Sequence, residues 1–283
     1  MSGWSLRWKE KGVIGPRALI DGSRLRPDTL SKLTLAEVAG VELEIGKRSV
    51  PLGDLFDIAP LLESGPSPRL SVDGSPRFIA LGASMEEGIL EVKDQAGDLL
   101  GAGMRGGAIR VAGDAGRLAG AGMTGGLIRI AGSAGPWVGG PLPGATTGMR
   151  GGEIIVLGNA GDEPSWLQRQ GLIAIGGSAG GFPGRDMLAG TLLVACGDLD
   201  QPGIGMGRGT ILGLESRSRP PLGFRRDGPV FHGWLRLLLR RLEEVGFSPP
   251  NDRRGLFTGE RPLDSWSGDR LSAGRGEILV PAS

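Results

Sequence analysis

The chain has 283 residues, which is enough for one large domain or two modest ones with a buried core. Its 32 lysine and arginine residues are balanced by 31 acidic residues, so net charge gives no argument for binding nucleic acid or a membrane surface. The 54 glycines far exceed average usage, yet 39% hydrophobic content is too high for disorder, so the glycines are expected to be structural. The N-terminus carries charges where a signal peptide is apolar, and no apolar run is long enough to cross a membrane, which predicts a cytoplasmic protein.

Residues 1–78 carry no repeat and are expected to form a small α/β cap. Residues 41–45 alternate apolar and polar side chains as a strand does, residues 46–48 suit a turn, and residues 52–62 form a short amphipathic stretch. A cap is expected because stacked strands that follow it would otherwise expose their edges and core.

Residues 79–213 contain a repeat marked by methionine. Successive methionines after the initiator are 19, 19, 26, 38 and 19 residues apart, and each is followed three residues later by glycine. The interval of 38 spans two repeats with Gln168 at its midpoint, and the interval of 26 is one repeat plus a seven-residue insertion, which we place within residues 139–144. The seven repeat positions are Met85, Met104, Met123, Met149, Gln168, Met187 and Met206.

The period and the glycine content together select a fold class. A fixed period near 20 is typical of a solenoid, and helices are not stable at this glycine density. The 19-residue spacing does not fit the 18-residue turn of six-residue-repeat helices, and the pattern of leucine-rich repeats is absent. The sequence therefore predicts a mainly β protein, a right-handed parallel β-helix of seven turns.

Alternation within the predicted strands separates an inner from an outer face. The inward positions are Ile109, Val111, Ile128, Ile130, Ile154, Val156, Ile173, Ile175, Leu192 and Val194. The outward positions are Glu91, Arg110, Arg129, Ile155, Ala174, Leu193 and Leu212. The outward row changes from charged to apolar halfway along, so something is expected to cover its later part.

Residues 214–283 are expected to hold a Pro/Arg-rich segment, one helix and a tail with little periodicity from residue 248. Within residues 233–246 leucine and valine recur at helical spacing, with arginine and glutamate opposite. Either this helix or a partner protein is expected to cover the apolar outer face.

The sequence predicts no catalytic residue and no metal site. The single histidine, His232, and the single cysteine, Cys196, have no second soft ligand near them in sequence. The methionine row is interpreted as core filling. The aspartates at glycine corners are interpreted as turn residues: Asp98, Asp114, Asp162, Asp186, Asp198 and Asp200.

Arginine is the remaining candidate for binding, because only five of the 32 basic residues are lysine. Three arginines follow repeat positions and are expected to line one edge, two more lie on adjacent outward positions, and others cluster after the repeats at residues 217–226. Guanidinium groups repeated at strand spacing suit a chain of carboxylates, although solvated faces balanced by acids remain an alternative. The candidates are Arg105, Arg110, Arg129, Arg150, Arg169, Arg208, Arg217 and Arg219.

The repeats at residues 101–116 and 120–135 read Gly-x-Gly-Met-x-Gly-Gly-x-Ile-x-Ile/Val-x-Gly-x-Ala-Gly. They resemble the glycine-rich β-helix of the glutamate synthase C-terminal domain and, more closely, the C subunit of formylmethanofuran dehydrogenase. The latter is also similar in having a Leu-Gly-Asp-Leu-Phe-Asp stretch, here residues 52–57, in a non-repeat region before the coil.

The resemblance implies a structural component without a cofactor of its own, within a complex whose other chains are catalytic. In the related bacterial formyltransferase/hydrolase complex, a formyl group passes from tetrahydromethanopterin to a methanofuran-type carrier and is released as formate. The resemblance implies that the arginines bind the polyglutamate tail of this carrier. Two alternatives stay open: a stand-alone β-helical carbohydrate-active enzyme, and a glutamate-synthase-like domain acting in trans.

Overall fold

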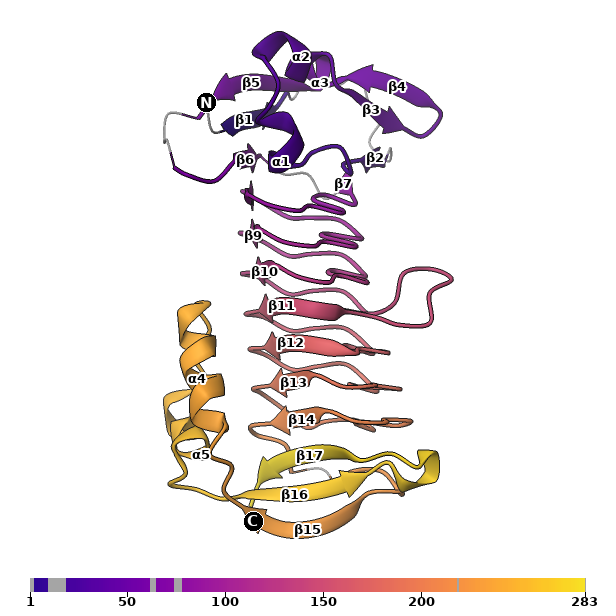
Figure 1. Cartoon of the computed structure of the whole chain (residues 1–283), viewed down its shortest axis with the longest axis vertical. Helices are drawn as coiled ribbons and strands as arrows, with labels where there is room; N and C mark the ends of the chain where they lie inside the picture. Colours follow the sequence, from indigo (N-terminus) through magenta and orange to yellow (C-terminus); the bar gives the residue numbers. More distant parts are fainter. Residues whose placement is uncertain (1–2, 10–18, 62–64, 74–77, 218, 283) are drawn as a thin grey trace.

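The computed structural model describes residues 3–9, 19–61, 65–73, 78–217 and 219–282. Within these residues the chain is mainly β, with a mixed 13-stranded sheet along the length of the molecule and a four-stranded sheet at the N-terminal end (Figure 1). Helices are short and lie at the two ends of the chain.

The N-terminal region extends the large sheet as well as capping it. Its elements are β1 (Gly3–Trp8), β2 (Ile20–Asp21), α1 (Pro27–Leu30), α2 (Leu35–Ala39), β3 (Glu42–Ile45), β4 (Arg48–Pro51), α3 (Leu52–Leu55), β5 (Phe56–Pro60), β6 (Arg69–Val72) and β7 (Phe78–Ile79). The predicted strand at 41–45 is confirmed as β3, which turns into β4. The amphipathic stretch predicted at 52–62 consists, in its described part, of two elements, because after one helical turn the chain pairs with β1, Phe56 opposite Trp8. Residue 62 lies outside the described residues.

Each of the seven repeats contributes one strand, and the strands stack in parallel. They are β8 (Ile89–Val92), β9 (Ala108–Val111), β10 (Leu127–Ile130), β11 (Arg150–Val156), β12 (Gln170–Ile175), β13 (Thr191–Val194) and β14 (Thr210–Gly213). The register matches equivalent residues, for example Ile109 with Ile128 and Ile128 with Ile154. A second row of parallel bridges joins Ala96, Ala115, Ala134, Ala160 and Ala179 away from the strands. Each repeat therefore lies on the equivalent residues of the one before.

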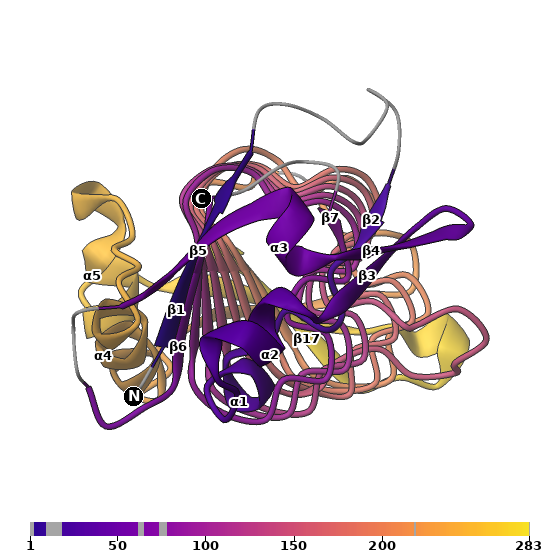
Figure 2. The same cartoon turned by 90° about the horizontal axis from the view of Figure 1, so that it is seen from above.

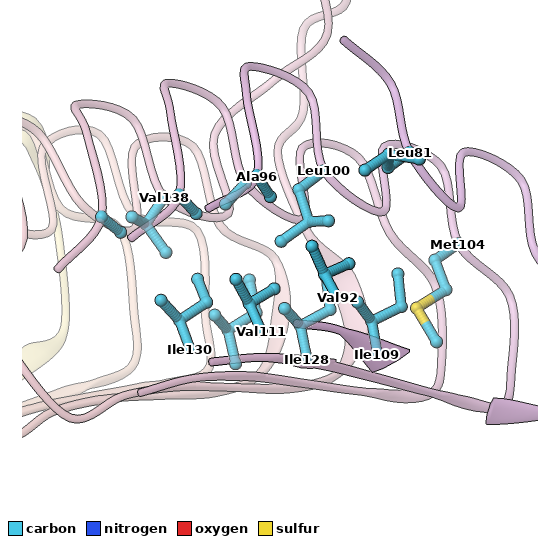
Figure 3. Packing of buried hydrophobic residues seen from close by; sticks show 14 of the residues in the cluster. Leu81, Val92, Ala96, Leu100, Met104, Ile109, Val111, Ile128, Ile130 and Val138 are labelled. Atoms are coloured by element: carbon cyan, nitrogen blue, oxygen red, sulfur yellow. The ribbon is translucent and has the colours of Figure 1, made fainter. Parts of the chain in front are cut away.

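The inner face of these strands forms the core (Figure 3). All ten predicted inward residues are buried, and so are all six repeat methionines, which confirms the interpretation of the methionines as core filling. Glycine three residues after the methionine is required by geometry: Gly126 has φ +89°, and a Cβ there would stand 2.6 Å from Met104 Cε and 2.9 Å from the Gly107 carbonyl oxygen.

The helix of this chain covers the apolar part of the outer face. α4 (Leu235–Glu244) packs Leu235, Leu239 and Leu242 into a second buried cluster with Ile155, Ala174, Leu193 and Leu212. Figures 1 and 2 show α4 alongside the later strands, outside the sheet. Glu153 accepts hydrogen bonds from both Nε and Nη2 of Arg241 at 2.6 Å, fixing the helix to β11.

The C-terminal region contains more regular structure than the predicted helix. It adds β15 (Arg225–Val230), η1 (Asn251–Arg253), α5 (Arg254–Thr258), β16 (Leu263–Gly268), η2 (Arg270–Ser272) and β17 (Gly276–Pro281). β17 pairs in parallel with β14, and β16 and β15 follow antiparallel, so they continue the sheet beyond the last repeat. The tail that was predicted from residue 248 contains β16 and β17, which its low periodicity did not indicate because each strand occurs once and is defined by pairing with distant residues.

The insertion in the fourth repeat forms a loop that projects from the stack (Figure 1). Gly139 N still donates to the Ala119 carbonyl at 2.9 Å, as the repeat requires, and Met149 N donates to the Gly139 carbonyl at 2.7 Å. The chain therefore leaves the path of the repeat after Gly139 and returns to it by Met149. The inserted segment is centred on residues 141–147, slightly later in the sequence than predicted.

Candidate functional site: arginines and a C-terminal cavity

The eight candidate arginines lie in three separate places. Arg105, Arg150 and Arg169 occupy one edge of the stack, where the backbone N of each donates at 2.8 Å to the carbonyl of a repeat-position methionine one repeat earlier. Arg208 lies near the end of the same row, because its neighbour Gly207 makes the equivalent bond to Met187. Arg110 and Arg129 lie on the outer face of β9 and β10, and Arg217 and Arg219 follow the last repeat.

The edge arginines differ in what they contact. Arg105 forms an exposed ion pair with Glu86 at 3.0 Å. Arg150, Arg169 and Arg208 are exposed, and their side chains make no ion pair with any residue that the structure describes. Arg150 and Arg169 are on adjacent repeats, as predicted.

The two outer-face arginines are engaged within the chain. Arg110 lies 3.7 Å from Glu91 on the neighbouring strand, and Arg129 donates from Nη2 to the Gly246 carbonyl at 3.4 Å, just beyond α4. These contacts favour the alternative given above, in which the two arginines belong to a solvated face and have partners within the chain, over a row of arginines that are free to bind a ligand.

Arg217 and Arg219 line a cavity of about 760 Å³ at the C-terminal end of the stack, called here the C-terminal cavity. Arg226, Arg253 and Arg261 also line it, and the remaining walls come from Glu215, Ser216, Asp264, Trp266, Val280, Pro281 and Ala282. Among the described lining residues, five guanidinium groups thus face two carboxylates.

Three of the five cavity arginines are held by neighbours. Arg226 Nη2 donates to both oxygens of the buried Asp264 carboxylate at 2.8 Å. Arg253 lies 3.6 Å from Glu215, and Arg261 Nη1 donates to a backbone carbonyl, that of Asp252, at 3.1 Å.

The other two have guanidinium groups without a charged partner in the described part of the chain. Arg217 is fixed at its backbone, where its N donates to Asp198 Oδ1 at 2.7 Å. Asp98, Asp114 and Asp162 accept a backbone N–H from the next repeat in the same way. Neither Arg217 nor Arg219 has a side-chain ion pair with a described residue.

The sequence indicated part of this cavity. The dense arginines at 217–226 were visible, but Arg253 and Arg261 lie in a segment without a pattern and reach the site only because residues 250–262 fold back. In the sequence, the one local hint of these two residues is the run Arg253-Arg254, which lies close to Arg261.

His232 and Cys196 form no nucleophilic arrangement. His232 Nε2 lies 3.1 Å from Glu277 Oε1, and Ser265 Oγ donates to the same oxygen at 2.9 Å, so the carboxylate separates the serine from the imidazole. Burial, followed by the Glu215 carboxylate, raises the pKa of the Cys196 thiol, which disfavours the reactive thiolate. Within the described residues no group of three or more His, Cys, Asp or Glu is placed to hold a metal ion.

Fold and site together define a class: a glycine-rich repeat protein of stacked parallel strands, with an arginine-lined cavity at one end. None of the helices in the described part is long and apolar enough to cross a membrane. No family model matches the sequence, and no curated protein matches it.

A solved structure is similar over 99% of the chain. The chain is similar to a chain in the X-ray crystal structure of the formyltransferase/hydrolase complex (FhcABCD) from Methylorubrum extorquens in complex with methylofuran. The identity is 34%, the TM-score is 0.85, and the match covers 99% of this chain and 100% of the other. The chain therefore belongs to the family of that component of formyltransferase/hydrolase complexes.

Proposed function

We propose that this chain is the structural C subunit of a cytoplasmic formyltransferase/hydrolase complex. Such a complex would move a formyl group from tetrahydromethanopterin to a methanofuran-type carrier and release it as formate. The observation that carries the proposal is the match over 99% of the chain to a component of a complex solved with methylofuran.

The proposed role is to hold catalytic subunits rather than to catalyse. We propose that residues 79–213 form a right-handed parallel β-helix of seven turns, with residues 1–78 as an N-terminal cap and residues 214–283 as a C-terminal region. The in-register strands and the second row of alanine bridges support this architecture. A stack of this kind offers long, rigid faces on which other subunits dock.

The eight candidate arginines are proposed to bind the acidic tail of the carrier. Support is strongest for Arg150, Arg169 and Arg208 on the edge and for Arg217 and Arg219 in the C-terminal cavity, whose guanidinium groups have no charged partner among the described residues. Support is weakest for Arg105, Arg110 and Arg129, which are engaged within the chain.

Affinity purification of the tagged chain from its native host tests the proposal, with mass spectrometry of the protein and small-molecule fractions. We expect formyltransferase-like and hydrolase-like subunits together with a glutamate-rich carrier. A lone monomer active on a carbohydrate would support the carbohydrate-enzyme alternative, and recovery of glutamate synthase subunits would support the domain acting in trans. Either result would overturn the proposal.

A further inference from the structure

We propose that the C-terminal cavity is a dedicated binding site for an oligocarboxylate, a chain whose carboxylates are separated by short hydrocarbon segments. This inference rests on the proposed function in one respect, which is that the carrier of the complex would supply the oligocarboxylate. The cavity is defined by the residues given above, which come from the segment after β14, from β15, from η1, from β16 and the segment before it, and from the end of β17 with Ala282 after it.

The charge of the cavity calls for an anion. Its described lining has five guanidinium groups against two carboxylates, an excess of three positive charges in a concave site. Like charges gathered around one concave site repel one another, and an anion bound in the site offsets this repulsion. Because Arg226 and Arg253 are paired with the two carboxylates, the excess resides on Arg217, Arg219 and Arg261.

The cavity is organised before a ligand arrives. The Arg226–Asp264 pair, in which Nη2 donates to both carboxylate oxygens, fixes one wall, and the backbone carbonyl of Asp252 accepts from Arg261. Arg253 is about four-fifths buried, and its Nε is buried without a hydrogen-bond partner in the described chain. Donors that are already held lose little conformational entropy when a carboxylate binds.

The apolar part of the cavity lining favours an oligocarboxylate over a compact anion as the ligand. Trp266, Val280, Pro281 and Ala282 lie among the arginines, and the volume of about 760 Å³ is many times that of one phosphate. Phosphate would leave these surfaces in contact with water, whereas the methylene groups of an oligocarboxylate would cover them. The combination therefore favours carboxylates on a hydrocarbon chain.

The test measures binding of synthetic hexaglutamate to the purified full chain by isothermal titration calorimetry at low salt. The double variant Arg217→Gln/Arg219→Gln removes the two cavity guanidinium groups without a charged partner and should weaken binding about tenfold or more. The matched control, Lys47→Gln/Arg48→Gln, removes equal charge from the exposed β3–β4 turn at the opposite end of the molecule and should weaken binding less than threefold. Thermal melting should show that both variants remain folded.

Three results would overturn the inference. The control could weaken binding as much as the cavity variant, which would make the effect one of general surface charge. Inorganic phosphate could compete at concentrations as low as hexaglutamate does, which would assign the cavity to a compact anion. The wild-type chain could also fail to bind hexaglutamate.

A separate readout keeps this inference distinct from the proposed function. Arg217 and Arg219 are not needed for docking in this account, so the double variant should co-purify with the same subunits as the wild type. If the wild-type chain co-purifies with its subunits but does not bind hexaglutamate, only the cavity assignment is refuted. If it binds hexaglutamate but co-purifies with no other subunit, only its proposed place in the complex is refuted.

Discussion

Gln168 is the one repeat position not occupied by methionine, and its side chain is fully buried in the row that the methionines fill. Its Nε2 donates to the Gly171 carbonyl at 2.9 Å, but its Oε1 is buried with no partner in the described residues. An unsatisfied buried amide oxygen costs about 1–3 kcal/mol.

We expect Gln168→Met to raise the free energy of unfolding by about 1 kcal/mol, because methionine fills a similar volume without an unsatisfied oxygen. Chemical denaturation of the purified chain measures this. The matched control, Met149→Gln in the preceding repeat, should lower the free energy of unfolding by about 2 kcal/mol. Destabilisation by Gln168→Met would show that the glutamine amide is satisfied or required.

Two glycines with similar φ allow the cost of a left-handed backbone to be distinguished from the cost of a steric clash at Cβ. Gly126 (φ +89°) has Met104 and Gly107 against it, whereas Gly144 (φ +80°), in the projecting loop, has nothing within 4 Å of where a Cβ would be. Gly144→Ala should therefore cost about 1–2 kcal/mol for the left-handed backbone, and Gly126→Ala clearly more. Equal melting temperatures for the two variants would contradict this.

At the scale of elements, the outer face shows what periodicity predicts well. The change from Arg129 to Ile155 along the outward row implied a cover, and the helical spacing of leucine in residues 233–246 supplied one; α4 confirms both. The C-terminal strands and the cavity they help to form were missed, since β17 pairs with β14 across more than sixty residues and leaves no local period.

Because α4 covers the apolar outer face with one side only, two of its leucines should contribute differently to stability. Leu242 is fully buried and Leu237 is 71% exposed. Leu242→Ala should lower the free energy of unfolding by about 2–4 kcal/mol and speed amide hydrogen exchange in α4, whereas Leu237→Ala should change it by less than about 0.5 kcal/mol. Equal effects would mean that α4 does not pack as described.

The projecting loop should be dispensable for folding. Neighbouring repeats close in 19 residues, so removing residues 141–147 restores the regular spacing between Met123 and Met149. We expect the shortened chain to fold with a melting temperature within about 5 °C of the wild type, because a shorter loop costs little closure entropy. Failure to fold would show that the loop braces the stack. Loss of partner proteins by a folded variant would instead identify the loop as a docking element.

At the scale of the whole molecule, the sequence predicted the repeat, its inner and outer faces and the covering helix, because each leaves a periodic record. It predicted the arginines as a set but not their distribution, since it depends on how distant segments fold back whether Arg129 reaches the Gly246 carbonyl and whether Arg217 and Arg261 line one cavity. The molecule that results is a stack of parallel strands with a basic cavity at one end and, among the described residues, no group of three or more His, Cys, Asp or Glu placed to hold a metal ion.

We propose that this chain assembles a complex and supplies none of its reacting groups. The most direct test is to purify the complex from strains with and without this chain and to assay formyl transfer and formyl hydrolysis separately. We expect that, without the chain, the catalytic subunits no longer purify as one particle while each folded subunit keeps its own partial reaction. Loss of either partial reaction from a folded catalytic subunit, restored by adding the chain, would show that the chain contributes to the chemistry and would contradict the account.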